Sequence, residues 1–257
     1  MTATRVRIAA VSYLNTIPFI YGIEHAGKLR AQLVLSPPAG CADTFLRGEA
    51  DIALVPVGAL PNLPSEAKII SSYCLGSNGG VRSVVLATNS PMNSIRRIHL
   101  DNHSRTSVLL TRYLAVKKWD IAPDWCELTD YSVVDNPAEG DAFVLIGDKV
   151  FPREGQFKYM YDLSDEWKAL TRLPFVFAVW VAHESVPAEV LDALEESLTW
   201  GLEHTWEAIV EYGYDHLPYA YDYLTRNMDY LFDAQKHKAL VKFWNDGLKT
   251  TLRINPG

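Results

Sequence analysis

The order of apolar segments near the start of the chain constrains the fold more than any other feature. The runs at 6–11 (VRIAAV), 33–35 and 52–55 have the length and composition of buried strands. Between them, SYLNTIPF leads into a helix with Pro18 in its first turn, and the spacing at 41–47 predicts a second short helix. This β-α-β-α-β order predicts a parallel sheet, because parallel neighbours need helical crossovers.

Two further strands are expected at 68–73 and 81–87. A second β-α-β series starts after Thr88, with strands at 98–100, near 126–128 and within DAFVLIGD at 141–148. Between the strands at 68–73 and 81–87, the loop at 76–80 carries Gly79 and Gly80, which match neither the dinucleotide fingerprint nor a P-loop. The adjacent glycines suggest a positive φ or a close backbone approach, and we propose no nucleotide.

Two strongly apolar strands, at 81–87 and 175–182, are placed to carry the chain between two parts of the protein. Two such connections would make a hinge. We therefore expect an α/β protein with one unit formed by 1–88 and 179–257 and another formed by 89–178. After the second crossover, the spacing predicts helices at 187–212, 219–231 and 233–246.

Composition limits the kinds of partner and compartment. Hydrophobic residues make up 48% of the chain, and the formal net charge of −7 argues against a general nucleic-acid or anionic-membrane surface. The three cysteines, Cys41, Cys74 and Cys126, are far apart and lack a C-x-x-C spacing, so neither a disulfide framework nor a metal site is expected. The N-terminus has no signal-peptide pattern and no stretch reaches transmembrane length, so we expect a cytoplasmic protein. The oligomeric state stays open.

The stretch RIHLDNHSRTSVLLTRYL at 97–114 changes from a strand to a helix at Ser104. The first turn contains Ser104, Arg105, Thr106 and Ser107, where backbone N–H groups lack helical partners and the helix dipole is positive. A carboxylate or phosphate is favoured at such a turn. The alternative is that Ser104 is only an N-cap and the other hydroxyls are solvated.

Polar residues also follow two other predicted strands. Ser12 and Asn15 come after the run at 6–11, and Gly147 and Asp148 close the strand that begins at 141. Ligands of open α/β sheets bind at the carboxyl ends of the strands, so these positions join the candidate binding site.

Five motifs taken together resemble the chorismate dehydratase family of the futalosine route to menaquinone. They are SYLNTIPF, GGVRSVVL, LDNHSRTSVLL, DAFVLIGD and the run YDL…W…LPFVFAVW, and they cover most of residues 6–182. The resemblance implies the two-lobed fold of type II periplasmic binding proteins, with two crossover strands as the hinge and the ligand in a cleft. It also implies a carbon–oxygen lyase that needs no cofactor and whose substrate is the dianion chorismate.

The resemblance gives roles to the candidate residues. Ser104, Thr106 and Ser107, with Arg105, Ser12, Gly80, Gly147 and Asp148 nearby, would bind substrate. Asn15 and Ser83 would hold the other carboxylate or the departing hydroxyl, as donors of the oxyanion-hole kind. Ser83 has an alternative role as a packing residue within its strand.

The catalytic base is not assigned by the sequence. His103 adjoins the predicted site, but a single loop histidine is often solvated or a cap, and Asp148 would repel a dianion. A substrate carboxylate would be a third candidate. Two other functions stay open: a non-catalytic small-anion binding or sensing protein of the same fold, and the sister enzyme that makes dihydroxynaphthoate. The sister enzyme's N-terminal motif differs from SYLNTIPF.

Overall fold

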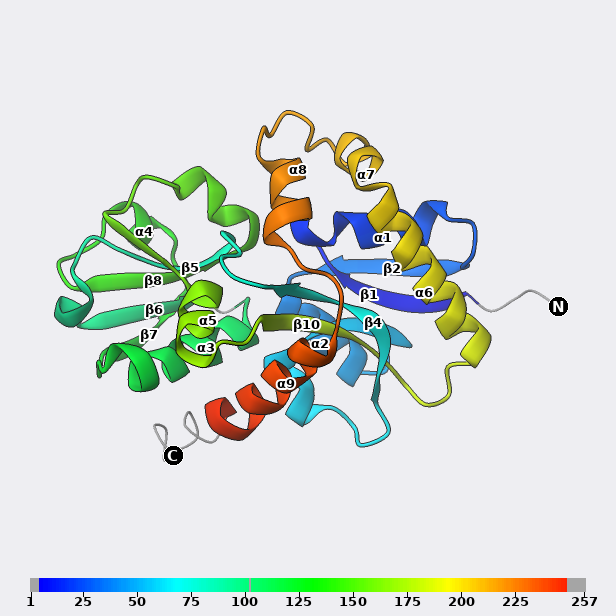
Figure 1. Ribbon diagram of the computed structural model, residues 1–257, viewed down its shortest axis with the longest axis horizontal. Coiled ribbons are helices and arrows are strands. Elements are labelled where there is room, and N and C mark those ends of the chain that lie inside the picture. The colour runs from blue at the N-terminus through cyan, green and yellow to red at the C-terminus, as the bar shows by residue number, and fades with distance from the viewer. Residues whose placement is uncertain (1–4, 102, 249–257) are drawn as a thin grey trace. The chain divides into compact units, whose positions relative to one another are not determined.

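The computed structural model describes residues 5–101 and 103–248, which form two compact units (Figure 1). The first contains the residues up to Gly76 together with Phe177–Asp233, and the second contains Ser77–Val176 and the chain from Ala234 onward. Each unit is built on a five-stranded mixed sheet. The expected two-lobed α/β architecture is therefore present.

The sheet of the first unit has the strand order β2-β1-β3-β10-β4. β1 (Val6–Val11) is parallel to β2 (Ala31–Ser36) and β3 (Ile52–Pro56), as the β-α-β order predicts. β10 (Phe175–Ala182) returns antiparallel to β3, and β4 (Lys68–Ser77) forms the edge. β3 is buried along its whole length, which explains its continuous apolar sequence.

Helices cover this sheet, and two of them approach each other closely. α1 (Ile17–His25) starts with Pro18 in its first turn and runs beside α6 (Ala188–Glu203), as Figure 1 shows. Gly201 of α6 makes this approach possible, because a Cβ atom built there would lie 2.0 Å from the carbonyl oxygen of Pro18. The remaining helical segments of the unit are η1 (Leu14–Thr16), α2 (Pro38–Leu46), η2 (Val57–Asn62), α7 (Thr205–Glu211), α8 (Ala220–Asp222) and η7 (Tyr223–Asn227).

The sheet of the second unit has the order β7-β6-β8-β5-β9. β6 (Arg97–Asp101) is parallel to both β7 (Asp124–Leu128) and β8 (Asp141–Ile146). β5 (Val84–Thr88) is antiparallel to β8 and to β9 (Tyr159–Asp162). The carboxyl ends of β6, β7 and β8 therefore lie at one edge of the sheet.

The helices of the second unit include one from the end of the chain. The unit contains α3 (Arg105–Leu114) and α5 (Leu163–Thr171). It also contains α9 (Ala234–Lys242) and its continuation η8 (Phe243–Leu248). Phe243 packs edge to face on Trp167 and Phe175, with ring centroids 5.9 and 5.3 Å away. The other helical segments are η3 (Met92–Ser94), η4 (Ala115–Trp119), α4 (Ser132–Asp135), η5 (Gly147–Lys149) and η6 (Phe151–Arg153).

The crossover strands differ in part from those expected. β10 leads the chain into the first sheet as predicted, but the strand that leaves it is β4. The run at 81–87 gives β5, which pairs only within the second sheet, so the units divide near 76 and 176 and not at 88 and 178. The chain from Ala234 onward also belongs to the second unit, because η8 packs on α3 and α5.

Two helix predictions also differ from the structure. The helix expected over 187–212 is two helices, α6 and α7, which meet at His204, a residue outside helical geometry. The helix expected over 219–231 ends at Asn227, since the next residues pair with β4: the Cys74 N–H donates to the Tyr230 carbonyl, and the Phe232 N–H to that of Ser72. None of the helices that the structure describes has both the length and the apolar character needed to cross a bilayer.

Candidate ligand-binding site

The carboxyl ends of β6 and β8 place several expected residues at one edge of the second sheet. β6 ends at Asp101 and the chain enters α3 at Arg105, while β8 ends at Ile146 and continues into η5. These two strands are neighbours, so Ser104 and Gly147 lie at the same edge. This is the edge at which open α/β sheets bind their ligands.

Ser104 is the N-cap of α3. Its side-chain oxygen accepts the backbone N–H of Ser107 at 3.0 Å, and its own N–H donates to the carbonyl of Asp101 at 3.2 Å. The capping interpretation of Ser104 is therefore confirmed, and the Ser107 N–H is already engaged. Thr106 and Ser107 are each 2% exposed, whereas Arg105 is half-buried. An anion at this turn would meet mainly Arg105, Thr106 and the helix dipole.

Ser83 and Gly147 are brought together by the antiparallel pairing of β5 with β8. The Gly147 N–H donates to the Ser83 carbonyl at 2.7 Å, and Ser83 is only 1% exposed. Gly147 has φ +64°, a conformation that favours glycine, and Asp148 follows it half-buried in η5. Ser83 precedes the first residue of β5, so it lies at a strand start and not within a strand as expected.

The backbone before Ser83 is strained and held in place by an acidic residue. Arg82 has φ +65°, and its N–H donates to Asp162 Oδ2 at 2.6 Å. Its guanidinium pairs with Glu154 at 3.0 Å. Gly80 faces the same acid, since a Cβ built there would lie 3.5 Å from Asp162 Oδ2. The conformation of this loop depends on Asp162 and Glu154, because a non-glycine residue at positive φ costs roughly 1–2 kcal/mol.

Asp162 is also the N-cap of α5. Its Oδ1 accepts the N–H groups of Ser164 and Asp165 at 3.0 and 3.2 Å. Burial raises the pKa of this carboxyl to about 6, despite these backbone donors and that of Arg82, which favour the charged form.

Four polar side chains form a hydrogen-bonded cluster at the same edge of the sheet, and sequence reasoning identified only His103 among them. Asp101, fully buried at the end of β6, accepts hydrogen bonds from Lys149 and Tyr131. Lys149 also contacts His103 Nδ1 at 2.9 Å and the Tyr131 hydroxyl at 2.6 Å. Asp101 is the last residue of β6 and Lys149 is the third residue after β8, so both lie at strand ends, which is a signal the sequence carried. Nothing in the sequence marked Tyr131.

In the first unit, Ser12 and Asn15 lie at the carboxyl end of β1. Ser12 is exposed, and its N–H donates to the carbonyl of Ser36 at the end of β2. Asn15 is half-buried in η1. The structure thus places these two expected residues in one loop of the first unit, and all the other expected residues in the second unit.

The Asn15 side chain is oriented by its neighbours. Thr16 donates its hydroxyl to Asn15 Oδ1 at 3.0 Å, so the amide presents its N–H groups away from that contact as donors. The Tyr230 hydroxyl donates to the Asn15 backbone carbonyl at 2.9 Å. Burial raises the pKa of Tyr230 well above its ordinary value, so this hydroxyl keeps its proton. Neither Thr16 nor Tyr230 is among the residues predicted for the site.

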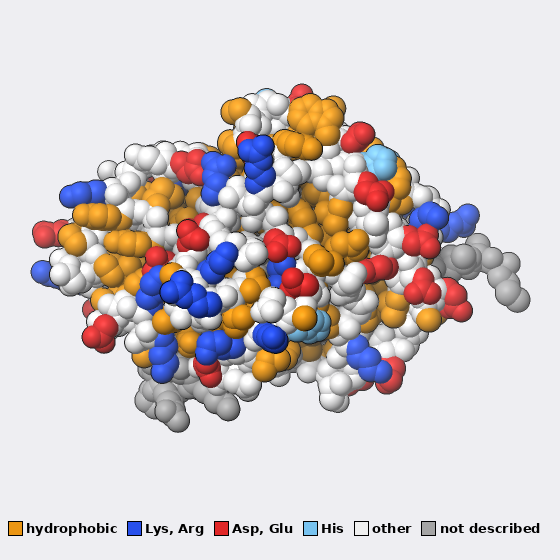
Figure 2. Space-filling view, in the orientation of Figure 1, with side chains coloured by type: hydrophobic (Ala, Val, Ile, Leu, Met, Phe, Trp, Pro, Cys, Tyr) orange, Lys and Arg blue, Asp and Glu red, His pale blue; other side chains and the backbone are white. Residues whose placement is uncertain are grey.

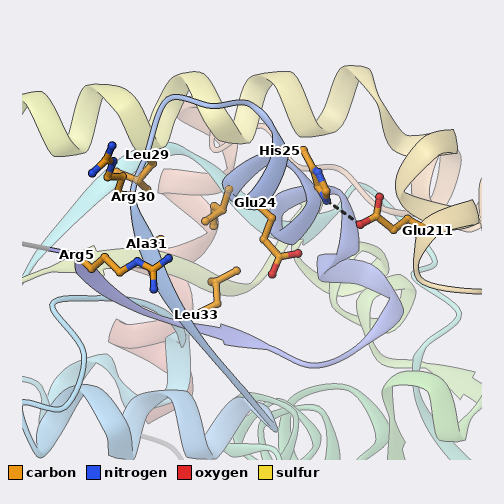
Figure 3. A pocket seen from close by; sticks show the side chains of 9 residues that line it. Arg5, Glu24, His25, Leu29, Arg30, Ala31, Leu33 and Glu211 are labelled. Carbon is orange, nitrogen blue, oxygen red and sulfur yellow. Dashed lines mark hydrogen bonds and ion pairs between the residues drawn. The ribbon is translucent and has the colours of Figure 1, made fainter.

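A cavity of about 440 Å³ lies elsewhere in the first unit (Figure 3). It opens at the amino ends of β1 and β2, and its lining includes Arg5, Arg30, Glu24, and the pair His25–Glu211, joined at 2.8 Å. Its charged groups have both signs, and no expected site residue lines it. Among the residues described, no three His, Cys, Asp or Glu side chains are grouped so as to hold a metal ion.

Charged side chains of both signs are interspersed over the face seen in Figure 2. With a formal net charge of −7, the chain offers an anion no general attraction. Binding of an anionic ligand must therefore come from local groups, such as those at the start of α3.

Comparison with known proteins gives one family and one fold. A family model described as menaquinone biosynthesis matches residues 6–247. Protein AF1704 of Archaeoglobus fulgidus is 18% identical, with a TM-score of 0.79 over 98% of this chain and 100% of its own. The aliphatic sulphonate binding protein SsuA of Escherichia coli is 14% identical, with a TM-score of 0.66 over 100% of this chain and 95% of its own.

The third similar structure belongs to a protein whose fold is named. The Candida albicans CA3427 gene product, which has the generic periplasmic binding protein fold, is 13% identical, with a TM-score of 0.57 over 95% of this chain and 81% of its own. At these identities the likeness concerns the fold alone. It agrees with the two-lobed fold predicted from the sequence.

Proposed function

Since the chain belongs to the menaquinone biosynthesis family, we propose that it catalyses the dehydration of chorismate to 3-[(1-carboxyvinyl)oxy]benzoate, the first step of the futalosine route. The family expected from the sequence motifs is confirmed by the match over residues 6–247, and the particular step is our proposal. The family match is the observation that carries it. The proposed activity is that of a cytoplasmic carbon–oxygen lyase that acts without a cofactor.

The proposed reaction removes one molecule of water and makes the ring aromatic. A proton leaves the ring carbon that bears the enolpyruvyl ether, and the electron pair delocalises toward the ring carboxylate. The neighbouring hydroxyl then departs with a proton as water. No electrons are gained or lost, so the step needs no oxidant. Donors that hold the ring carboxylate stabilise the charge that develops in the transition state.

The start of α3 supports the binding half of the proposal. Thr106 is buried in the first turn, Arg105 carries a positive charge there, and the helix dipole adds to it. We assign one substrate carboxylate to this turn. Ser104 and Ser107 contribute mainly by fixing its geometry, because their mutual bond already uses the Ser104 oxygen and the Ser107 N–H. Ser12, Gly80, Gly147 and Asp148 remain proposed substrate-binding positions.

Asn15 and Ser83 carry the proposed chemistry. The amide of Asn15 is turned by Thr16 so that its N–H groups are donors, as stabilisation of developing negative charge requires. The Ser83 hydroxyl would act in the same way on the departing group. We assign the proton-accepting role to a substrate carboxylate, because Asp148 is assigned to substrate binding and His103 Nδ1 is engaged by Lys149.

The test is to mix purified protein with chorismate and follow the aromatic product by absorbance and mass. Water loss and accumulation of 3-[(1-carboxyvinyl)oxy]benzoate are expected. Binding of chorismate without conversion would refute the lyase and favour a small-anion binding protein, which the likeness to solute-binding structures keeps as the second candidate. Conversion of a later pathway intermediate, with chorismate untouched, would instead identify the dihydroxynaphthoate-forming sister enzyme.

A further inference from the structure

The contacts of Lys149 determine which nitrogen of His103 carries the proton. The Lys149 ammonium reaches three acceptors: Asp101 Oδ2 at 3.0 Å, the Tyr131 oxygen at 2.6 Å and His103 Nδ1 at 2.9 Å. An ammonium group can only donate, so Nδ1 must be the accepting nitrogen. In a neutral imidazole the hydrogen is then on Nε2.

The buried carboxylate of Asp101 does not compete for this ring. Its Oδ1 lies 3.7 Å from His103 Nδ1, beyond hydrogen-bonding distance, and accepts the His103 backbone N–H at 2.9 Å instead. Its Oδ2 accepts from Tyr131 and Lys149. The cluster therefore holds both the backbone and the ring of His103, and it does so beside the N-cap of α3, whose Ser104 N–H donates to the Asp101 carbonyl.

Of His103, Asp101 and Lys149, His103 has the most exposed side chain. The His103 side chain is 42% exposed, whereas that of Asp101 is fully buried and that of Lys149 is 26% exposed. With Nδ1 engaged by the lysine, the N–H group of the ring is on Nε2, and His103 directly precedes Ser104, the N-cap of the proposed anion-binding turn. Such a group donates to a carboxylate and cannot accept a proton from carbon.

We propose that His103 is a substrate-binding donor, held as the neutral Nε2–H tautomer by Lys149, and that it is not the catalytic base. This inference rests on the proposed function for the identity of the carboxylate. Lys149, Asp101 and Tyr131 are positioning residues that act through His103. The simpler role of Lys149, as a counter-charge for Asp101 alone, would leave the ring tautomer unfixed.

The first test needs no ligand. Nitrogen-15 NMR of the imidazole rings, with the His103 signals assigned by their loss in His103→Gln, reports the tautomer directly. We expect the Nε2–H form in the wild type, the same form in Tyr131→Phe, where the Lys149 to His103 bond remains, and a mixture in Lys149→Met. An Nδ1–H or doubly protonated ring in the wild type at neutral pH would overturn the proposal, whether or not Lys149→Met folds.

The second test uses chorismate and two variants of one residue. His103→Gln keeps an N–H near the place of Nε2, and His103→Leu removes it. We expect KM to rise roughly ten- to a hundredfold in His103→Leu and to stay within about threefold in His103→Gln, with kcat little changed in both. An unchanged KM in His103→Leu, or an equal collapse of kcat in both variants, would overturn the proposal.

If the wild-type protein leaves chorismate unchanged, the proposed function is refuted but the tautomer assignment of His103 is not. The donor role would then be tested with benzoate as the probe, by titration of the same His103 signals. A shift of the Nε2–H signal on saturation supports a carboxylate contact. Signals that do not move at saturating benzoate, measured by calorimetry, would overturn the donor role.

Discussion

The hydroxyl of Tyr230 donates to the backbone carbonyl of Asn15 at 2.9 Å, although the two residues are 215 positions apart. The Tyr230 ring also packs on Phe19 of α1, with centroids 5.1 Å apart. The loop after β1 is therefore fixed by a residue from the segment that follows η7, and the position of the Asn15 amide depends on it.

Tyr230→Phe is expected to lower kcat roughly three- to tenfold and stability by about 1 kcal/mol, because the ring still packs but the bond to Asn15 is lost. Steady-state kinetics and urea unfolding measure the two effects. Tyr73→Phe is the matched control: Tyr73 also contacts Phe19, but its one hydroxyl bond is to Thr199 and not to Asn15. Equal losses of kcat in both variants would show that Tyr230 acts only through stability.

Ser83→Ala is expected to lower kcat roughly ten- to a thousandfold while chorismate binding stays within a few fold, because the hydroxyl would act on charge that develops in the transition state. Kinetics and direct binding separate the two effects. Ser90→Ala serves as the control, since Ser90 is also buried and accepts a hydrogen bond from the Gly140 N–H. A normal kcat in Ser83→Ala would leave this serine as a packing residue.

Thr106→Val should weaken the substrate and the transition state alike, so KM should rise by an equivalent of about 1–2 kcal/mol with kcat little changed. Thr111→Val removes another buried hydroxyl from the same helix, one that lies beyond the first turn and donates along the helix to the Ser107 carbonyl. KM should be normal in that variant. Equal KM values in the two variants would contradict the anion-binding role proposed for this turn.

Arg82 provides a test of backbone strain next to Ser83. Arg82→Gly and Arg82→Ala both remove the ion pair with Glu154, but only glycine adopts φ +65° without strain. The glycine variant should therefore be more stable than the alanine variant by about 1 kcal/mol in urea unfolding. Glu154→Gln isolates the contribution of the ion pair. An alanine variant as stable as the glycine variant would mean that the loop relaxes.

Asp162 should make stability depend on pH. Since burial raises its pKa from 3.8 to about 6, the folded protein keeps a proton that the unfolded chain has already lost between these values. The free energy of unfolding should therefore fall as pH rises from about 4 to about 6, by roughly 1–3 kcal/mol relative to Asp162→Asn. Urea unfolding across this range measures the difference.

The pH dependence of Asp162 has an internal control. Asp165→Asn removes the neighbouring carboxylate, which also raises the pKa of Asp162, but leaves Asp162 buried. The free energy of unfolding of this variant should still fall as pH rises from about 4, but the fall should end at a lower pH than in the wild type. Parallel curves for the wild type and Asp162→Asn would contradict the raised pKa.

The sequence was sufficient for features that depend on neighbours along the chain. The strand at Val6–Val11, the helix entered at Pro18 and the strand Phe175–Ala182 have the predicted places, because burial on both faces and the proline requirement act locally. The N-cap at Ser104 was recognisable for the same reason.

Features that depend on distant partners were not predictable in this way. The run that forms β5 is as apolar as a crossover strand, and only its antiparallel partners, β8 and β9, assign it to the second sheet. β9, with the sequence YMYD, is partly exposed and resembles a turn. The same holds at the candidate site, where Lys149, Tyr131 and His103 come together from three separate segments of the chain.

Because Phe243 completes the packing around Trp167 and Phe175, the second unit cannot finish its core until η8 has left the ribosome. The first unit in turn needs β10 and the helices after it, which are made only once the middle of the chain is complete. During synthesis, therefore, the sheet of the first unit stays incomplete until β10 has been made. Neither unit can be expressed as one continuous fragment.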